Sequence, residues 1–250
     1  MKVVRFPNRI GRLETRTRLL SGQAENRPLT LFSRFEVLRF SPRLTIGSFM
    51  RFEATSLEGF VQQVAVSYLR NGYWFYCAGA IPWSKDPREI DRKLVEQYEA
   101  GISKHARYRR RVARLATVVY IRHGHFFLLM ASKGEHDFFA REKGQIRDAR
   151  RHPIRVGGYS LSVKTGGKVC VRIDSSEYIW IKNRLLERAL SSKAFLEHVF
   201  SRMPFEPYRS VRAQLLALLR AVNHKRKRAS LPPLDRACVR WRRRIVRPFE

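Results

Sequence analysis

Acidic side chains are scarce in this sequence of 250 residues. Asp and Glu together number 21, against 51 Lys and Arg, so the formal net charge is +30 at pH 7. A charge of this size repels itself, and the simplest explanation is a polyanionic partner that neutralises it. Hydrophobic residues still make up 44% of the chain, which is ordinary for a folded protein and excludes a purely disordered basic tail.

Long apolar runs are also missing. The longest purely apolar segment is Phe126–Ala131, far short of the roughly 20 residues that a membrane span needs. The N-terminus shows no apolar stretch typical of a secretory signal. We therefore expect no membrane partner and a cytoplasmic or nucleoid-associated location, with an organellar matrix as the alternative.

Cysteine is rare as well. Cys77, Cys170 and Cys238 stand far apart and form no C-x-x-C pair, which argues against a disulfide scaffold and against a cysteine-based zinc finger. We expect three reduced thiols in a reducing compartment.

The positive charge is denser at the two ends of the chain than in the middle. Residues 1–49 hold 10 basic and 3 acidic side chains, residues 50–201 hold 27 and 15, and residues 202–250 hold 14 and 3. We expect residues 1–49 to be a basic, poorly ordered N-terminal extension. Three origins for it stay open: an arm that orders on nucleic acid, an organellar presequence, or translated sequence ahead of a start at Met50.

The remaining sequence predicts three parts: an α+β central domain (50–173), a helical C-terminal part (174–224) and a basic tail (225–250). Residues 73–164 show, in order, strand, helix, helix, strand, strand, helix and strand patterns. The expected elements are a helix over 57–70, strands over 73–81, 116–121, 125–131 and 154–164, and helices from Asp86, over 103–114 and over 136–150. Without the basic helix 103–114, the order is β-α-β-β-α-β, the ferredoxin-like order.

Turn and cap residues predict the rest of the C-terminal half. Thr165-Gly166-Gly167 separates two alternating segments and predicts a hairpin that ends at Ile173. Asp174, with Glu177 three residues later, predicts a helix start. Two further helices are expected over Ser192–Phe200 and Ser210–Asn223.

The inserted helix Ser103–Arg114 is the strongest candidate for a phosphate contact. It contains no acidic residue and six basic ones: Lys104, Arg107, Arg109, Arg110, Arg111 and Arg114. At 100° per residue Lys104, Arg107, Arg111 and Arg114 share one stripe, and guanidinium groups suit phosphate oxygens because they donate two hydrogen bonds at once. The alternative is a solvated helix face.

The C-terminal tail is the second basic candidate. Its cations are Lys225, Arg226, Lys227, Arg228, Arg242, Arg243 and Arg244, and Trp241 lies beside the last three. Mixed Lys and Arg runs suit phosphates and also targeting signals, and an exposed Trp stacks on bases. A flexible electrostatic tail without defined contacts stays open.

Aromatic strands offer another route to nucleic acid. Tyr73–Tyr76 and His125–Phe127 fall on strands that would be central and adjacent in a ferredoxin-like sheet. Outward-facing rings there would form a base-stacking platform, whereas inward-facing rings would belong to the core.

A histidine pair suggests chemistry. His123 and His125 are two apart, so both would face the same way on an extended strand. This pair resembles the HUH nucleases, which include replication initiators and single-strand transposases, although Gly124 departs from the hydrophobic residue of that pattern. The resemblance implies a divalent metal, Mg²⁺ or Mn²⁺, with His136 as a third ligand, and a helix tyrosine that attacks DNA. Tyr178 with Lys182 one turn later would supply the nucleophile and a cation.

Two functions therefore remain as hypotheses. The first is a binder of DNA or RNA that acts through the phosphate backbone, with stacking as an addition, inside a ribonucleoprotein or a mobile-element complex. The second is a metal-dependent nuclease, replication initiator or transposase of the HUH kind. Whether the protein is an enzyme stays open at this point.

Overall fold

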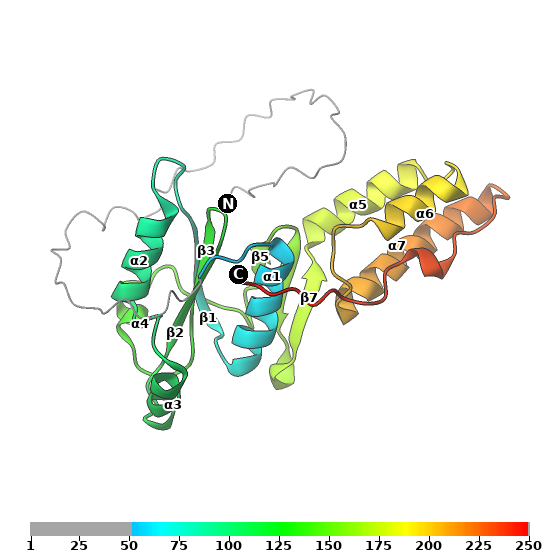
Figure 1. The fold of residues 1–250 in the computed structure, drawn as a ribbon. Helices are drawn as coiled ribbons and strands as arrows, with labels where there is room; N and C mark the ends of the chain where they lie inside the picture. The colour runs from blue at the N-terminus through cyan, green and yellow to red at the C-terminus, as the bar shows by residue number, and fades with distance from the viewer. Residues whose placement is uncertain (1–51, 250) are drawn as a thin grey trace. The chain divides into compact units, whose positions relative to one another are not determined.

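Four antiparallel strands form the first sheet (Figure 1). They are β1 (Phe75–Ala80), β2 (Val118–His123), β3 (Phe126–Ala131) and β4 (Arg147–Asp148), in the order β2-β3-β1-β4. β2 and β3 pair as the predicted hairpin. Arg122 and His123 belong to β2, however, so the turn consists of Gly124 and His125, and Gly124 adopts a left-handed φ of 57° that costs glycine little.

The structure is a computed structural model that describes residues 52–249, which belong to one compact unit, Met50–Glu250. The predictions for residues 1–49, including their poor order and their three possible origins, lie outside the described residues, as does Met50.

The first sheet is covered on both faces. Tyr120 of β2 donates its hydroxyl to Asp91 of α2 (Pro87–Gln97) at 2.5 Å, whereas Val119 packs in a core with Phe60 of α1 (Leu57–Gln62). Because successive side chains of a strand point to opposite faces, α1 and α2 lie on opposite faces of the sheet, as Figure 1 shows. The start of α2 follows the sequence prediction, since the Asp86 side chain accepts the Arg88 N–H and Pro87 occupies the first turn.

The predicted helix over residues 57–70 is helical throughout but changes type along its length. After α1 the chain forms a π-helical segment, η1 (Gln63–Tyr68), and then a short 3-10 segment, η2 (Leu69–Asn71). The helix ends at Gly72, whose φ of 91° lies in the left-handed region that favours glycine.

The prediction of one helix between residues 136 and 150 is wrong over most of its length. Only α4 (Asp137–Arg141) is helical there, and β4 follows as the edge strand beside β1. Gly144 lies just after α4, and glycine costs helix interiors about 1 kcal/mol. Pairing with β1 is a long-range contact that local sequence does not reveal.

The predicted strand 154–164 is also corrected, because it is two strands of a second sheet. β5 (Ile154–Val156), β6 (Tyr159–Val163) and β7 (Val169–Ile173) pair antiparallel in that order. Gly157 and Gly158 both have positive φ and form the turn between β5 and β6. The predicted hairpin at Thr165–Gly167, here the 3-10 segment η3, is confirmed between β6 and β7.

Three helices complete the C-terminal half: α5 (Ser175–Glu187), α6 (Lys193–Ser201) and α7 (Arg209–Arg228). Asp174 caps α5 as predicted, since its carboxylate accepts the Ser176 N–H. Core residues of α5 and α7 share one hydrophobic cluster with Val119 of the first sheet and Leu161 of the second. Residues on both sides of the predicted boundary at 173 therefore contribute to the same core.

The segment after α7 runs back along the body of the unit and contains one short 3-10 segment, η4 (Arg236–Cys238) (Figure 1). The Gln62 side chain donates to the Val246 carbonyl at 2.8 Å, and the Thr55 N–H donates to the Pro248 carbonyl at 3.1 Å. Within residues 52–249, no helix has the length and apolar character that crossing a membrane requires.

Candidate nucleic-acid interface

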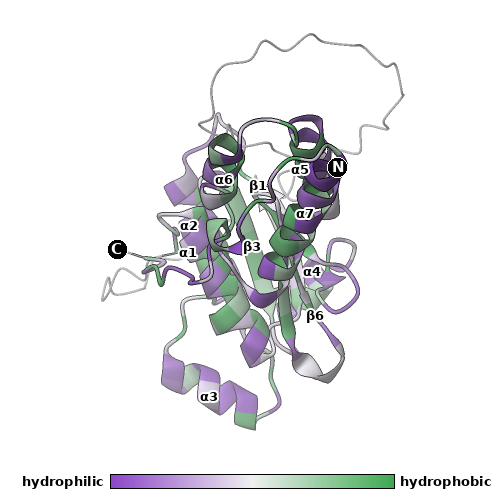
Figure 2. Ribbon diagram, turned by 90° about the vertical axis from the view of Figure 1, so that its right-hand side faces the viewer, coloured by the Kyte–Doolittle hydropathy of each residue, from purple (hydrophilic) through white to green (hydrophobic). Residues whose placement is uncertain are grey.

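The basic helix α3 (Lys104–Val112) forms where the sequence predicts it, between α2 and β2. Ser103 caps it by accepting the Ala106 N–H at 3.2 Å. None of the helix residues, all of which are described, is buried, and Figure 2 shows α3 standing apart from the other helices. The core therefore does not use this helix, and its side chains are available to a partner.

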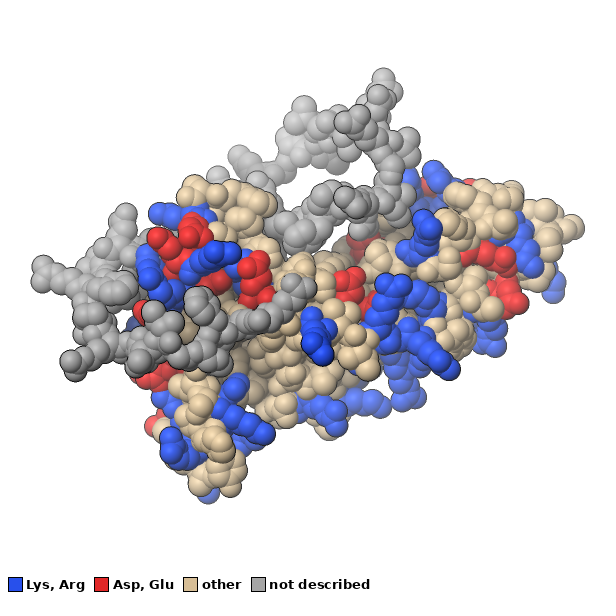
Figure 3. Space-filling model, viewed as in Figure 1, with Lys and Arg blue, Asp and Glu red and all other residues tan. Residues whose placement is uncertain are grey.

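Most of the cations in this segment have no acidic partner. Of the six predicted contact residues, Arg110 alone forms an ion pair within residues 52–249, with Glu99. Lys104, Arg107 and Arg111 are helical and share one face, as predicted. Arg114 lies beyond the helix end at a φ of 59°, so the predicted stripe has three members on the helix and Arg114 beside it. Figure 3 shows Lys and Arg side chains at the lower left, where Figure 1 labels α3.

Two large apolar side chains also lie exposed on α3. Tyr108 is 66% exposed and Val112 is 67% exposed. They lie four residues apart and therefore on neighbouring turns of the same side. Their exposure is a property of the fold, because the position of α3 outside the core decides it.

The basic cluster Lys225–Arg228 is not a free tail but the last turn of α7. Arg226 is 2% exposed and donates to the carbonyls of Ala189, Ser191 and Pro232. Its prediction as a phosphate contact is therefore wrong: the guanidinium satisfies backbone carbonyls that would otherwise be buried without donors.

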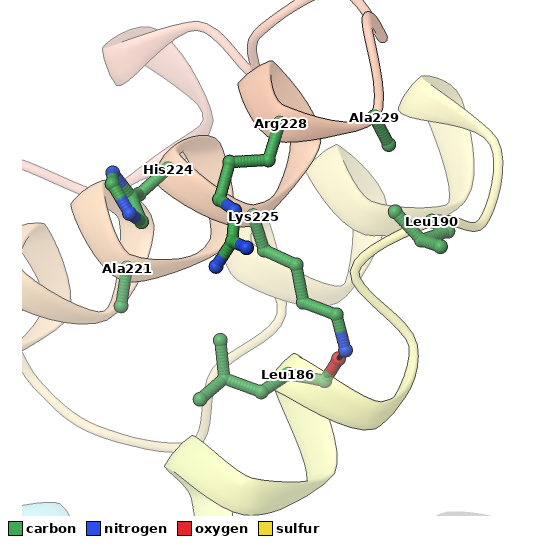
Figure 4. A pocket seen from close by; sticks show the side chains of 7 residues that line it. All are labelled: Leu186, Leu190, Ala221, His224, Lys225, Arg228 and Ala229. Atoms are coloured by element: carbon green, nitrogen blue, oxygen red, sulfur yellow. Dashed lines mark hydrogen bonds between the residues drawn. The ribbon is translucent and has the colours of Figure 1, made fainter.

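The other three cations of the cluster are exposed. The Lys225 Nζ donates to the Leu186 carbonyl at 2.9 Å, beside a hollow of about 640 Å³ between α5 and α7 that Arg228 and His224 also line (Figure 4). Lys227 and Arg228 have no ion pair within the described part of the chain and remain candidate contacts.

The arginines of the C-terminal segment are anchored rather than loose. Glu206, which is 5% exposed, accepts a hydrogen bond from the Arg240 side chain and another from the Arg244 N–H at 2.9 Å. The Arg243 guanidinium lies 4.8 Å from the centre of the Tyr208 ring. Arg242 and Arg244 are exposed. The expectation of a flexible tail is thus corrected for the described residues of this segment.

Trp241 is 46% exposed, as stacking on a base would require. The Arg212 guanidinium lies 5.6 Å from its ring centre and donates to the Trp241 carbonyl at 3.1 Å.

The aromatic strands do not form an outward-facing platform. Tyr73, Tyr76 and Phe127 are buried, and the Tyr76 hydroxyl donates to the carbonyls of His152 and Pro153. Both faces of the sheet are covered, so these rings belong to the core.

The three histidines have separate local roles. His123 Nδ1 lies 2.9 Å from the Ala54 carbonyl, and His125 Nδ1 lies 3.0 Å from the Ile81 carbonyl with its ring against Trp83. His136 Nδ1 accepts the Phe138 N–H and so caps α4, while burial holds its pKa below the ordinary 6.5. Within residues 52–249 no three His, Cys, Asp or Glu side chains gather into a group that would hold a metal ion. The predicted Mg²⁺ or Mn²⁺ site therefore has no ligand set there.

Tyr178 and Lys182 lie one turn apart on α5, as predicted. Tyr178 is half-buried and packs against the hydrophobic core, whereas Lys182 is exposed. In the HUH resemblance a bound metal polarises the phosphate that the tyrosine attacks, and the described residues do not assemble such a centre around Tyr178.

A charge network surrounds the buried Arg122, which no sequence pattern predicts. Arg122 is 3% exposed and pairs with Asp91 of α2 at 2.9 Å and with Glu53 at 2.8 Å. The Tyr120 hydroxyl donates to the same Asp91. Burial, and then the negative charge of Asp91, raise the pKa of the Tyr120 phenol. Arg122 donates hydrogen bonds to both carboxylates, so the network fastens α2 and the Glu53 segment to β2.

Comparison of the chain with models of protein families, with curated proteins and with solved structures found no match.

Proposed function

We propose that the protein binds DNA or RNA through its phosphate backbone, with α3 as the principal contact element. The observation that carries the proposal is the group of six basic side chains on α3 and directly after it, with one acidic partner among the described residues and no buried side chain on the helix.

The packing of α3 supports this proposal. Arg107 and Arg111 lie four residues apart, and like charges at that spacing destabilise a helix by a few tenths of a kcal/mol. A helix that adds nothing to the core and repels itself gains stability from a polyanion. Arginine, the main cation here, matches phosphate oxygens with paired donors.

The exposed apolar side chains of α3 suit the same partner. Tyr108 offers a ring that stacks on a base or lies against a sugar, beside the cations that contact the phosphates. We therefore propose that α3 makes phosphate contacts with limited base readout.

We further propose that the first sheet has the ferredoxin-like arrangement. Its strand order β2-β3-β1-β4, with α2 and α3 between β1 and β2 and α4 between β3 and β4, supports this reading. The fold does not choose the function, because binders and nucleases share it.

Fluorescence anisotropy of the full chain with labelled single-stranded DNA, single-stranded RNA and duplex DNA tests the proposed function. We expect binding to at least one of them, and about tenfold weaker binding by Arg107→Gln/Arg111→Gln, since a charged contact contributes on the order of 1 kcal/mol or more. Lys143→Gln/Arg220→Gln removes the same charge from exposed positions elsewhere and is the matched control. Wild-type protein that binds none of the three at low salt overturns the proposal.

A further inference from the structure

A second basic surface lies in a groove that the sequence analysis did not find. Its volume is about 400 Å³, and its basic lining residues are Arg70, Lys168, Arg209 and Arg243. They come from η2, the β6–β7 hairpin, the start of α7 and the C-terminal segment. Only the fold brings these four together.

The charged residues that line the groove are all basic. Its described lining contains no Asp or Glu, and none of the four cations forms an ion pair within residues 52–249. Arg70, Lys168 and Arg209 are exposed and Arg243 is half-buried. Four unpaired cations around one hollow repel one another unless an anion occupies it.

One of the cations is held in position before any ligand arrives. Arg243 lies over the Tyr208 ring, and the buried Glu206 holds Arg240 and Arg244 on either side of it. A positioned guanidinium loses less freedom when it binds a phosphate than a mobile one does.

The lining of the groove also includes apolar and aromatic residues. Val169 and Tyr208 line it together with the cations. A duplex hides its base faces, whereas a single strand exposes bases that can contact these apolar side chains while its phosphates contact the cations. The π-helical segment η1 contributes to the same lining, and such segments are frequent at functional sites.

We infer that this groove binds the phosphate backbone of a single-stranded nucleic acid. The inference rests on the proposed function and names the surface that receives the strand. Its chemistry is shared with mononucleotides and inorganic phosphate, so the test needs arms that separate these ligands.

The test compares Arg70→Gln/Lys168→Gln with Lys143→Gln/Arg220→Gln in the full chain. All four positions are exposed, so both double variants should fold, which circular dichroism checks. We expect the groove variant to bind a labelled single strand about tenfold more weakly than the control does, and to lose less affinity for a duplex of the same sequence. Groove and control variants with equal single-strand affinity overturn the inference, as does an equal loss on strand and duplex.

Two further arms locate and identify the ligand. Ultraviolet crosslinking of the single strand, read by mass spectrometry, should label a peptide that contains Tyr208 or Lys168; labelling confined to α3 contradicts the inference. Competition with inorganic phosphate and with a mononucleotide should displace the strand only at far higher concentrations, and displacement at equal concentration assigns the groove to a small ligand instead. Absence of any wild-type binding refutes the proposed function itself, which is a distinct result.

Discussion

The Arg243 guanidinium lies 4.8 Å from the centre of the Tyr208 ring, at the edge of the groove beside the start of α7. These two residues join the C-terminal segment to the helical part of the fold. What keeps them together is the carboxylate of Glu206, which accepts the N–H of the residue after Arg243. The basic C-terminal segment is therefore part of the body of the protein, and its arginines have fixed neighbours.

Removal of the Glu206 carboxylate should release this segment. We expect Glu206→Ala to lower the free energy of unfolding by about 1–3 kcal/mol, because it removes the acceptor of the Arg240 side chain and of the Arg244 N–H. Trypsin should then cut at Arg242–Arg244 faster than in the wild type, as mass spectrometry of timed digests would show. Glu187→Gln, at an exposed position of α5, is the control. Equal cleavage rates in all three proteins would mean that Glu206 does not anchor the segment.

Arg226 should matter for stability and its neighbour Lys227 should not. Arg226→Ala leaves three carbonyls without their donor, and each buried unsatisfied group costs about 1–3 kcal/mol. We expect a loss of at least about 3 kcal/mol in urea unfolding, against a change within about 0.5 kcal/mol for the exposed Lys227→Ala. Similar unfolding midpoints for the two variants would contradict the structural role of Arg226.

His136 should make stability depend on pH. Burial, and then the nearby Arg110, hold its pKa below the ordinary 6.5, so the unfolded chain binds a proton more readily than the folded one. Its contribution is complete above about pH 6.5 and is lost as the pH falls below that value. We expect the free energy of unfolding to fall less between about pH 7.5 and about pH 5.5 in His136→Asn, which keeps a capping acceptor but does not titrate. If the free energy of unfolding has the same pH dependence in the wild type and in the variant, His136 does not contribute to that dependence.

Local signals were sufficient for much of the fold. The caps at Asp86, Ser103 and Asp174 act within three residues, and the hairpin between β2 and β3 needs only a short turn. The sequence accordingly predicts α2, α3, α5 and that hairpin. The sequence also predicts the charge on α3, because its cations lie close together in the chain and no acidic residue lies among them.

Long-range contacts set the rest. The alternation of residues 154–164 continues through Gly157 and Gly158, so it does not show that the chain turns back there. In the sequence Arg226 is one more cation in a basic run. Its burial depends on the carbonyls of the loop after α5, to which it donates. The groove was hidden for the same reason, since Arg70 and Arg243 meet only in the folded chain.

The salt dependence of binding tests the central claim most directly. The logarithm of the association constant should fall linearly with the logarithm of the salt concentration, and loss of two phosphate contacts in Arg107→Gln/Arg111→Gln should reduce the slope by about 2. The control Lys143→Gln/Arg220→Gln should keep the wild-type slope. If the α3 variant keeps that slope as well, or if binding is insensitive to salt, the protein does not hold nucleic acid through the phosphate contacts of α3.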